Sequence, residues 1–256
     1  MNVTFLGTGA AGGVPRYGCH CPACERARVD KSRQRLPCSA SLQSGSTRIL
    51  LDAGLMDLHE RFEPGDLDAI LLTHYHPDHV QGLFHLRWGV AETLPVWGPR
   101  DSEGCADLYK HPGMLGFGTL RKFKPIEIGS LLITPLPLIH SKVTLGFAIE
   151  TADNARFAYL TDTVGLPPKT LRFLKAWQPH GMALDCSHAP QATPPRNHND
   201  VNLALELIEA IRPKRAWLTH ISHNVDLWQM TTGATLPDNV FWAADQLSVS
   251  FGLDGH

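Results

Sequence analysis

The segment Leu71–His79 constrains the fold of this chain more than any other part of the sequence. A short apolar stretch runs into three imidazoles and one carboxylate within six residues: His74, His76, Asp78 and His79. Residues two apart in an extended loop point the same way, so the first two histidines can hold one ion. Pro77 suits the first turn of a helix, which places Asp78 and His79 at a helix start, facing a second ion. Imidazole and carboxylate are common ligands of borderline divalent metals, so a metal site is predicted here.

Composition excludes several classes of protein. The chain has 256 residues, and 43% of them are hydrophobic, which is typical of a folded protein. Its net charge of −2 does not favour binding to the phosphate backbone of a nucleic acid. No apolar run approaches the roughly 18 residues of a membrane span, and the first residues lack the features of a signal peptide. We therefore expect a cytoplasmic protein without a membrane partner. No linker divides the sequence, so a single domain over residues 1–256 is predicted.

Short apolar runs alternate with helical patterns. The expected strands are Asn2–Leu6, Arg48–Asp52, Ala69–Thr73, Pro95–Trp97, Leu131–Leu136, Gly146–Glu150, Arg156–Leu160, Gly181–Asp185 and Arg215–Thr219. Helices are expected over Pro168–Trp177 and Val201–Ile211, the second capped by Asn199 or Asp200 and stopped by Pro213. This order predicts an α/β sandwich, with two sheets inside and helices outside.

The pattern His74-x-His76-x-Asp78-His79 resembles the signature of the metallo-β-lactamase superfamily. The resemblance implies an αβ/βα four-layer sandwich and further ligands at later strand ends, for which His140, Asp162 and His220 are in the right order. One ion would be held by His74, His76 and His140. The second would be held by Asp78, His79 and His220, with Asp162 bridging the two. Asp52, at an earlier strand end, is expected to orient a ligand.

Three cysteines lie close together in Cys19-His20-Cys21-Pro22-Ala23-Cys24. Thiolates favour tetrahedral zinc, and a structural zinc site needs a fourth ligand. We predict His223 as that ligand, because it lies three residues after His220 and can join this strand end to the cysteine loop. His20 is the competitor. The remaining cysteines, Cys38, Cys105 and Cys186, are scattered and are read as small buried residues.

A cysteine loop beside a two-metal site narrows the resemblance to the PhnP family of phosphodiesterases, which accompany carbon–phosphorus lyase in phosphonate breakdown. The resemblance covers nearly the whole chain, with Pro195-Arg196-Asn197-His198 and Thr219–His223 among the matching segments. It implies hydrolysis of 5-phospho-α-D-ribosyl 1,2-cyclic phosphate to ribose 1,5-bisphosphate by a hydroxide shared between the two ions. His198 would be the general acid, and the predicted catalytic residues are His198 and Asp78. Manganese is favoured over zinc at the active site, with one structural Zn²⁺ at the cysteines.

Other functions share part of this pattern. A tRNase Z-like enzyme or another cyclic-nucleotide phosphodiesterase is the alternative of the same class, but the long basic arm for tRNA is missing from this sequence. β-Lactamases and glutathione thioester hydrolases share the metal motif and lack the three-cysteine loop. A non-catalytic metal-binding module is the alternative from another class, and the complete set of seven ligands argues against it.

Further expectations concern the substrate and the partners. Four cations are candidates for holding a distal phosphate of a small substrate: Arg16, Arg87, Lys142 and Arg196. A homodimer is expected only because such assemblies are common. The stretch Gly7–Gly12 matches the pattern of a dinucleotide site, but a turn is predicted instead, because further glycines and Pro15 follow where a helix would have to begin.

Overall fold

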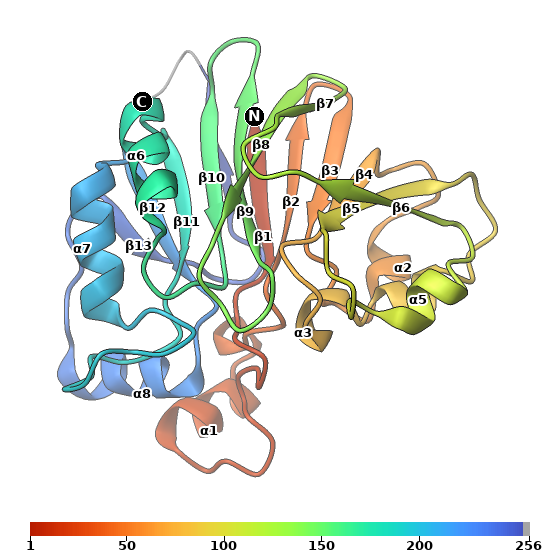
Figure 1. Ribbon diagram of the computed structural model, residues 1–256. Coiled ribbons are helices and arrows are strands. Elements are labelled where there is room, and N and C mark those ends of the chain that lie inside the picture. The colour runs from red at the N-terminus through yellow and green to blue at the C-terminus, as the bar shows by residue number, and fades with distance from the viewer. Residues whose placement is uncertain (253–256) are drawn as a thin grey trace.

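Two seven-stranded sheets pack face to face in the computed structural model, which describes residues 1–252 (Figure 1). The first sheet has the order β14 (Ser248–Ser250), β1 (Asn2–Gly7), β2 (Ser39–Ser44), β3 (Thr47–Leu51), β4 (Ala69–Leu71), β5 (Leu94–Pro99) and β6 (Leu115–Leu120). The second has the order β13 (Val240–Trp242), β12 (Arg215–Thr219), β11 (Gly181–Asp185), β10 (Arg156–Leu160), β9 (Leu145–Thr151), β8 (Leu131–Pro137) and β7 (Ile126–Ile128).

Helices cover the outer face of each sheet. The first sheet carries α2 (Leu58–Arg61), α3 (Pro77–Val80), α4 (Leu83–Leu86) and α5 (Ala106–Lys110). The second carries α6 (Pro168–Trp177), α7 (Val201–Ile211) and α8 (His223–Thr232). Helix α1 (Pro22–Val29) and a 3₁₀ turn (Lys31–Arg33) lie at the lower edge of Figure 1, where α1 packs against α8. The predicted αβ/βα sandwich is confirmed.

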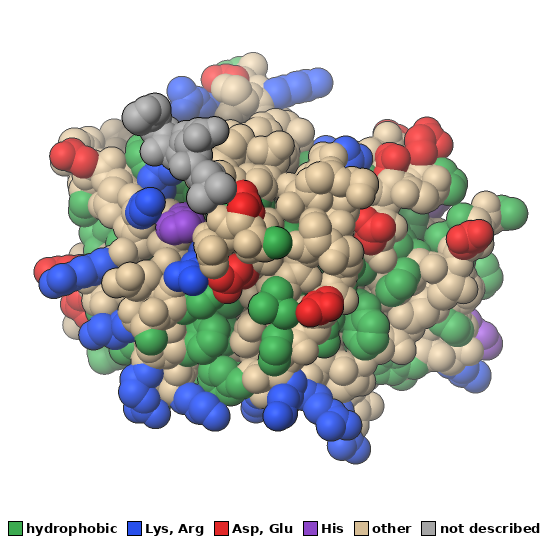
Figure 2. Space-filling view, turned by 90° about the horizontal axis from the view of Figure 1, so that it is seen from above, with side chains coloured by type: hydrophobic (Ala, Val, Ile, Leu, Met, Phe, Trp, Pro, Cys, Tyr) green, Lys and Arg blue, Asp and Glu red, His purple; other side chains and the backbone are tan. Residues whose placement is uncertain are grey.

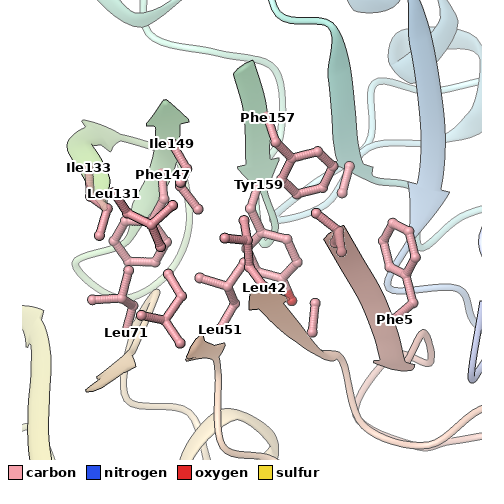
Figure 3. Close-up of a cluster of buried hydrophobic side chains, with 14 of the residues drawn as sticks. Phe5, Leu42, Leu51, Leu71, Leu131, Ile133, Phe147, Ile149, Phe157 and Tyr159 are labelled. Carbon is pink, nitrogen blue, oxygen red and sulfur yellow. The ribbon is translucent and has the colours of Figure 1, made fainter. Parts of the chain in front are cut away.

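Alternation along the central strands divides their side chains between two cores. In β10, Phe157 and Tyr159 face the core between the sheets, whereas Ala158 and Leu160 face the helices, as expected for a period of two. Phe147 and Ile149 of β9 also face the inner core (Figure 3). Because both faces of these strands are buried, they read as continuous apolar runs, which is why the sequence predicts them well.

Helix α7 shows how local sequence sets an element's bounds. The carboxylate of Asp200 accepts a hydrogen bond from the backbone N–H of Leu203 at 2.8 Å, which caps the first turn. Arg212 adopts the left-handed conformation at the other end, and Pro213 follows. Of the two residues predicted as the cap, the structure therefore selects Asp200.

The sequence prediction misses the six-residue strands β2 and β6 and three shorter strands at the sheet edges. The edge strands β7, β13 and β14 have only three residues each and exist through pairing with their neighbours. Gly7 ends β1, and no helix follows, so the prediction of a turn there holds; a Cβ at Gly7 would lie 2.0 Å from the carbonyl oxygen of Pro37. Cys105 differs from its prediction, because it is only partly buried at the start of α5.

The direction of the parallel strands decides at which edge of the sandwich the candidate site lies. Strands β3 to β6 are parallel, and so are β10 to β13. Their carboxyl ends lie toward the edge that carries α3 in Figure 1. Figure 2 views the opposite edge, where basic and acidic side chains are both spread over the surface. Within residues 1–252, no helix is long and apolar enough to cross a membrane.

Candidate metal centre

The predicted ligands follow strand ends at one edge of the sandwich. His74 and His76 lie in the loop after β4, and Asp78 and His79 begin α3. Asp162 follows β10, and His220 follows β12. Since the carboxyl ends of parallel strands meet at one edge of a sheet, residues far apart in sequence converge there. The structure brings all seven predicted active-site ligands together.

The first group consists of His74, His76, His140 and Asp162, whose ligand atoms lie within 4.8 Å of one another. Nδ1 of His76 lies 2.8 Å from Nε2 of His74 and 3.1 Å from Nε2 of His140. Oδ2 of Asp162 lies 3.7 Å from Nε2 of His74 and 3.6 Å from Nε2 of His140. Three nitrogens and one oxygen therefore surround a common point.

The second group consists of Asp78, His79, His220 and the other oxygen of Asp162. Nε2 of His79 lies 3.4 Å from Oδ2 of Asp78 and 3.5 Å from Oδ1 of Asp162. Nε2 of His220 lies 3.5 Å and 3.4 Å from the same two oxygens. Asp162 presents one oxygen to each group, which is the geometry of a bridging carboxylate.

These groups fit cations. Nδ1 of His79 lies 2.8 Å from Oδ2 of Asp52 and donates to it, so Nε2 faces the carboxylates of Asp78 and Asp162. Nε2 of His79 and Nε2 of His220 are buried and make no hydrogen bond within residues 1–252. Two carboxylates facing one imidazole nitrogen favour positive charge at that point, either a proton on the nitrogen or a bound cation. The donor set suits borderline divalent metals.

The pKa shifts point the same way. Burial would raise the pKa of the Asp162 carboxyl, but the imidazoles of His220 and His79 outweigh it and hold that pKa well below its usual range. Burial would lower the pKa of His79, but Asp162 and Asp52 raise it well above its ordinary value. The site is thus built to hold positive charge next to ionised carboxylates.

Neighbouring residues fix the orientation of the candidate ligands. Asp52 accepts hydrogen bonds from the backbone N–H and hydroxyl of Thr73, and Oγ1 of Thr73 lies 3.0 Å from Nδ1 of His74. Oγ of Ser187 lies 2.8 Å from Nδ1 of His220. Each of these contacts ties down Nδ1 and leaves Nε2 for the site. Asp52 therefore orients two imidazoles, one directly and one through Thr73.

His198 stands beside the two groups with a carboxylate partner of its own. Its Nδ1 donates to Oδ2 of Asp185 at 2.7 Å, and its ring stacks on His220 with a centroid distance of 4.9 Å. Asp185 is fully buried and also accepts from the backbone N–H of Thr163. Burial would lower the pKa of His198, but Asp185 outweighs it and raises that pKa to about 9. Sequence reasoning did not single out Asp185, although it ends a buried strand just as Asp162 follows one.

The cysteine loop forms a third group. Cys19, Cys21, Cys24 and Nδ1 of His223 lie within 4.8 Å of one another. Nδ1 of His223 lies 3.6 Å from Sγ of Cys19 and 3.5 Å from Sγ of Cys21. His20 instead pairs with Glu25 at 2.7 Å, and its side chain is 82% exposed. The geometry therefore favours His223 over His20 as the fourth member, and the donor set suits tetrahedral zinc.

Cys21→Ser is expected to lower the zinc content by one ion per chain and to reduce the melting temperature. A zinc at this site would tie the loop before α1 to α8, and each 1 kcal/mol lost lowers Tm by about 2–4 °C in a chain of this size. We expect a fall of at least about 4 °C in differential scanning fluorimetry. Cys105→Ser, a cysteine outside the group, is the matched control. An unchanged zinc content in Cys21→Ser would refute the site.

A family comparison agrees with this fold and site. Residues 47–221 match the model of the β-lactamase superfamily domain, and the chain belongs to that superfamily. A solved structure described as a diphosphatase from the PhnP family is 26% identical, covers 98% of both chains and superposes with a TM-score of 0.81. The resemblance to the PhnP family expected from the cysteine loop and the histidine motif is thus supported over the whole fold.

Curated relatives carry other names. An octanoyltransferase of Porphyromonas gingivalis is 27% identical over 248 residues, which is 90% of this chain and 47% of that protein. Coenzyme PQQ synthesis protein B of Methylobacterium radiotolerans is 30% identical over 175 residues, which is 60% of this chain and 57% of that protein. The chain spans about half the length of these relatives.

Proposed function

We propose that this protein is a metal-dependent hydrolase of phosphodiesters. The substrate we propose is 5-phospho-α-D-ribosyl 1,2-cyclic phosphate, opened by one water to ribose 1,5-bisphosphate. The observation that carries the proposal is the His198–Asp185 pair beside a bridging carboxylate, since it places a charged proton donor next to the two candidate metal groups. The likeness to a diphosphatase of the PhnP family supports phosphorus chemistry.

The chain's own residues divide the work between binding and proton transfer. The two groups that share Asp162 would hold two divalent ions, which would acidify water and offset charge on the phosphate. Asp185 fixes Nδ1 of His198, which leaves Nε2 to donate a proton. That proton passes to the oxygen of C2 as its bond to phosphorus breaks, so the ribose 2-hydroxyl leaves neutral. We propose manganese for these two sites and zinc for the cysteines.

A panel of substrates tests this assignment. We expect kcat/KM for the ribosyl cyclic phosphate to exceed that for 2′,3′-cyclic nucleotides, a precursor tRNA and an octanoyl thioester by about 100-fold or more. Preference for the precursor tRNA would favour a ribonuclease, and turnover of the thioester alone would favour acyl chemistry. Either result would overturn the proposal.

Asp185→Asn is expected to move the alkaline limb of the pH profile to lower pH. A general acid works only while protonated, so activity falls as the pH rises through its pKa in the folded protein. Asp185 raises the pKa of His198 to about 9 against the effect of burial, and the amide removes that support. Measuring kcat/KM from pH 6 to 10 checks the shift, with Asp238→Asn, an exposed aspartate outside the site, as control. A limb that stays in place would show that His198 is not the acid.

A further inference from the structure

Two cations lie on the two loops that meet at His140. Lys142 follows His140 by two residues, and Arg196 precedes His198 by two. The loops are joined directly, because Nδ1 of His140 lies 3.0 Å from the backbone oxygen of Asn197 and donates to it. Asn197 has a left-handed φ of 63°, and the N–H of His198 bonds to the oxygen of Arg196 across it at 2.7 Å. Lys142 and Arg196 thus lie on two loops that are joined at a candidate ligand, each cation two residues from a histidine of the site.

The ammonium group of Lys142 lies near two carboxylates but makes no hydrogen bond to either of them. Its Nζ lies 3.8 Å from Oδ2 of Asp101 and 3.8 Å from Oε2 of Glu103, both too long for a hydrogen bond. Asp101 is fixed by the backbone N–H groups of Glu103 and Gly104, whereas the side chain of Glu103 is 87% exposed. Burial raises the pKa of Asp101, but the two backbone N–H groups and Lys142 outweigh it and hold that pKa below its usual value. Asp101 is therefore an ionised partner for Lys142.

Arg196 is the second cation of the pair. Its residue is exposed, and within residues 1–252 its guanidinium makes no hydrogen bond or ion pair. A guanidinium offers five N–H donors in a planar fork that matches a phosphate. An arginine kept free on the loop of a proposed proton donor is available to a ligand.

The other two cations considered from the sequence lie elsewhere. Arg87 is tied to Asp107 at 2.7 Å and packs against the ring of Trp88. Arg16 lies 3.4 Å from Nε2 of His223, in the cysteine group. Neither contacts the seven active-site residues, so the choice narrows to Lys142 and Arg196.

We infer that Lys142 and Arg196 form a subsite for a second anionic group of the substrate, a terminal phosphomonoester; this rests on the proposed phosphodiesterase activity. Such a group carries about −1.5 to −2 charges at pH 7 and three acceptor oxygens, which one ammonium and one guanidinium can bind together. The phosphate would displace the exposed carboxylate of Glu103 from Lys142, whereas Asp101 keeps the lysine in place. A terminal phosphate is favoured over the next phosphate of an RNA chain, because a phosphomonoester offers three acceptor oxygens and more negative charge to two cations than a phosphodiester, which has two such oxygens and a single charge.

Paired substrates test the subsite. The ribosyl cyclic phosphate carries a terminal phosphate, and bis(p-nitrophenyl) phosphate does not. We expect Lys142→Met and Arg196→Met each to lower the ratio of kcat/KM between these two substrates by about 10-fold, chiefly through KM. Lys175→Met and Arg172→Met, exposed on α6, remove the same charges away from the site and serve as matched controls. An unchanged ratio in both variants would overturn the inference.

A binding measurement separates the subsite from the chemistry. Calorimetry with ribose 5-phosphate should show about 10-fold weaker binding in Lys142→Met and Arg196→Met than in the controls. If the wild-type protein hydrolyses neither substrate yet this loss appears, the proposed function fails and the subsite stands. If the variants weaken binding of a short oligoribonucleotide but not of ribose 5-phosphate, the terminal-phosphate subsite is wrong.

Discussion

Asp162→Ala is expected to abolish hydrolysis, with a loss of more than about 10³-fold in kcat/KM, or about 4 kcal/mol of transition-state stabilisation. Asp162 is the residue whose two oxygens reach both groups: Oδ1 lies 3.4 Å from Nε2 of His220, and Oδ2 lies 3.6 Å from Nε2 of His140. Without it, the first group keeps only imidazoles and the second keeps Asp78 as its one carboxylate, so both would hold divalent ions more weakly. Metal analysis of the purified variant should show the active-site ions depleted, with zinc at the cysteines retained.

Two further variants make that result interpretable. Asp162→Asn keeps the shape of the side chain and removes its charge, so a similar loss would assign the effect to the carboxylate. Asp238→Ala, an exposed aspartate outside the site, should behave as wild type. Full metal content together with wild-type turnover in Asp162→Ala would contradict the bridging role.

His198→Ala is expected to lower kcat by about 10² to 10⁴-fold and to leave the metal content unchanged. His198 lies close to Asp162 and His220 and has a ligand-type nitrogen, so a second reading of the geometry makes it a metal ligand. Its Nδ1 donates to Asp185 and leaves Nε2 free, as in His79, so metal analysis of the variant is the measurement that distinguishes an acid from a ligand. Loss of metal from the variant would show that it is a ligand rather than the acid.

The leaving group gives a sharper test of the same residue. A p-nitrophenolate leaves as a stable anion and needs little help from an acid, whereas a sugar alkoxide must be protonated. We therefore expect His198→Ala to slow the ribosyl cyclic phosphate much more than bis(p-nitrophenyl) phosphate. His111→Ala, an exposed histidine after α5, is the control. An equal loss on both substrates would argue for a role in binding instead.

Much of the fold and the candidate site is predictable because both depend on strands with two buried faces. Runs such as Arg156–Leu160 and Arg215–Thr219 are apolar enough to be recognised alone, and both match strands of the structure. The residues that follow them, Asp162 and His220, then lie at the same edge because the strands are parallel. Residues far apart in the sequence meet because the strands before them are parallel neighbours. A short histidine motif and the ends of later strands are therefore enough to predict the active-site ligands.

The residues that orient the site are less predictable. Asn197 acts through its backbone oxygen on His140, which depends on a left-handed turn rather than on its side chain. Ser187 lies in a loop, and its residue type does not distinguish it from other loop residues. Asp185 ends the buried strand β11, which is a signal like that of Asp162, but its contact with His198 depends on how the following loop folds back. The packing of α1 against α8 likewise joins segments about 200 residues apart.

Metal reconstitution of the stripped protein tests the central claim most directly. The protein is freed of metal with a chelator, and Mn²⁺ or Zn²⁺ is added in small increments while hydrolysis of bis(p-nitrophenyl) phosphate and bound metal are measured together. Turnover should be absent at first and should reach its plateau when about two ions per chain are bound beyond the one at the cysteines. Full uptake of these ions with no phosphodiester hydrolysis, or hydrolysis that persists without metal, would contradict the account.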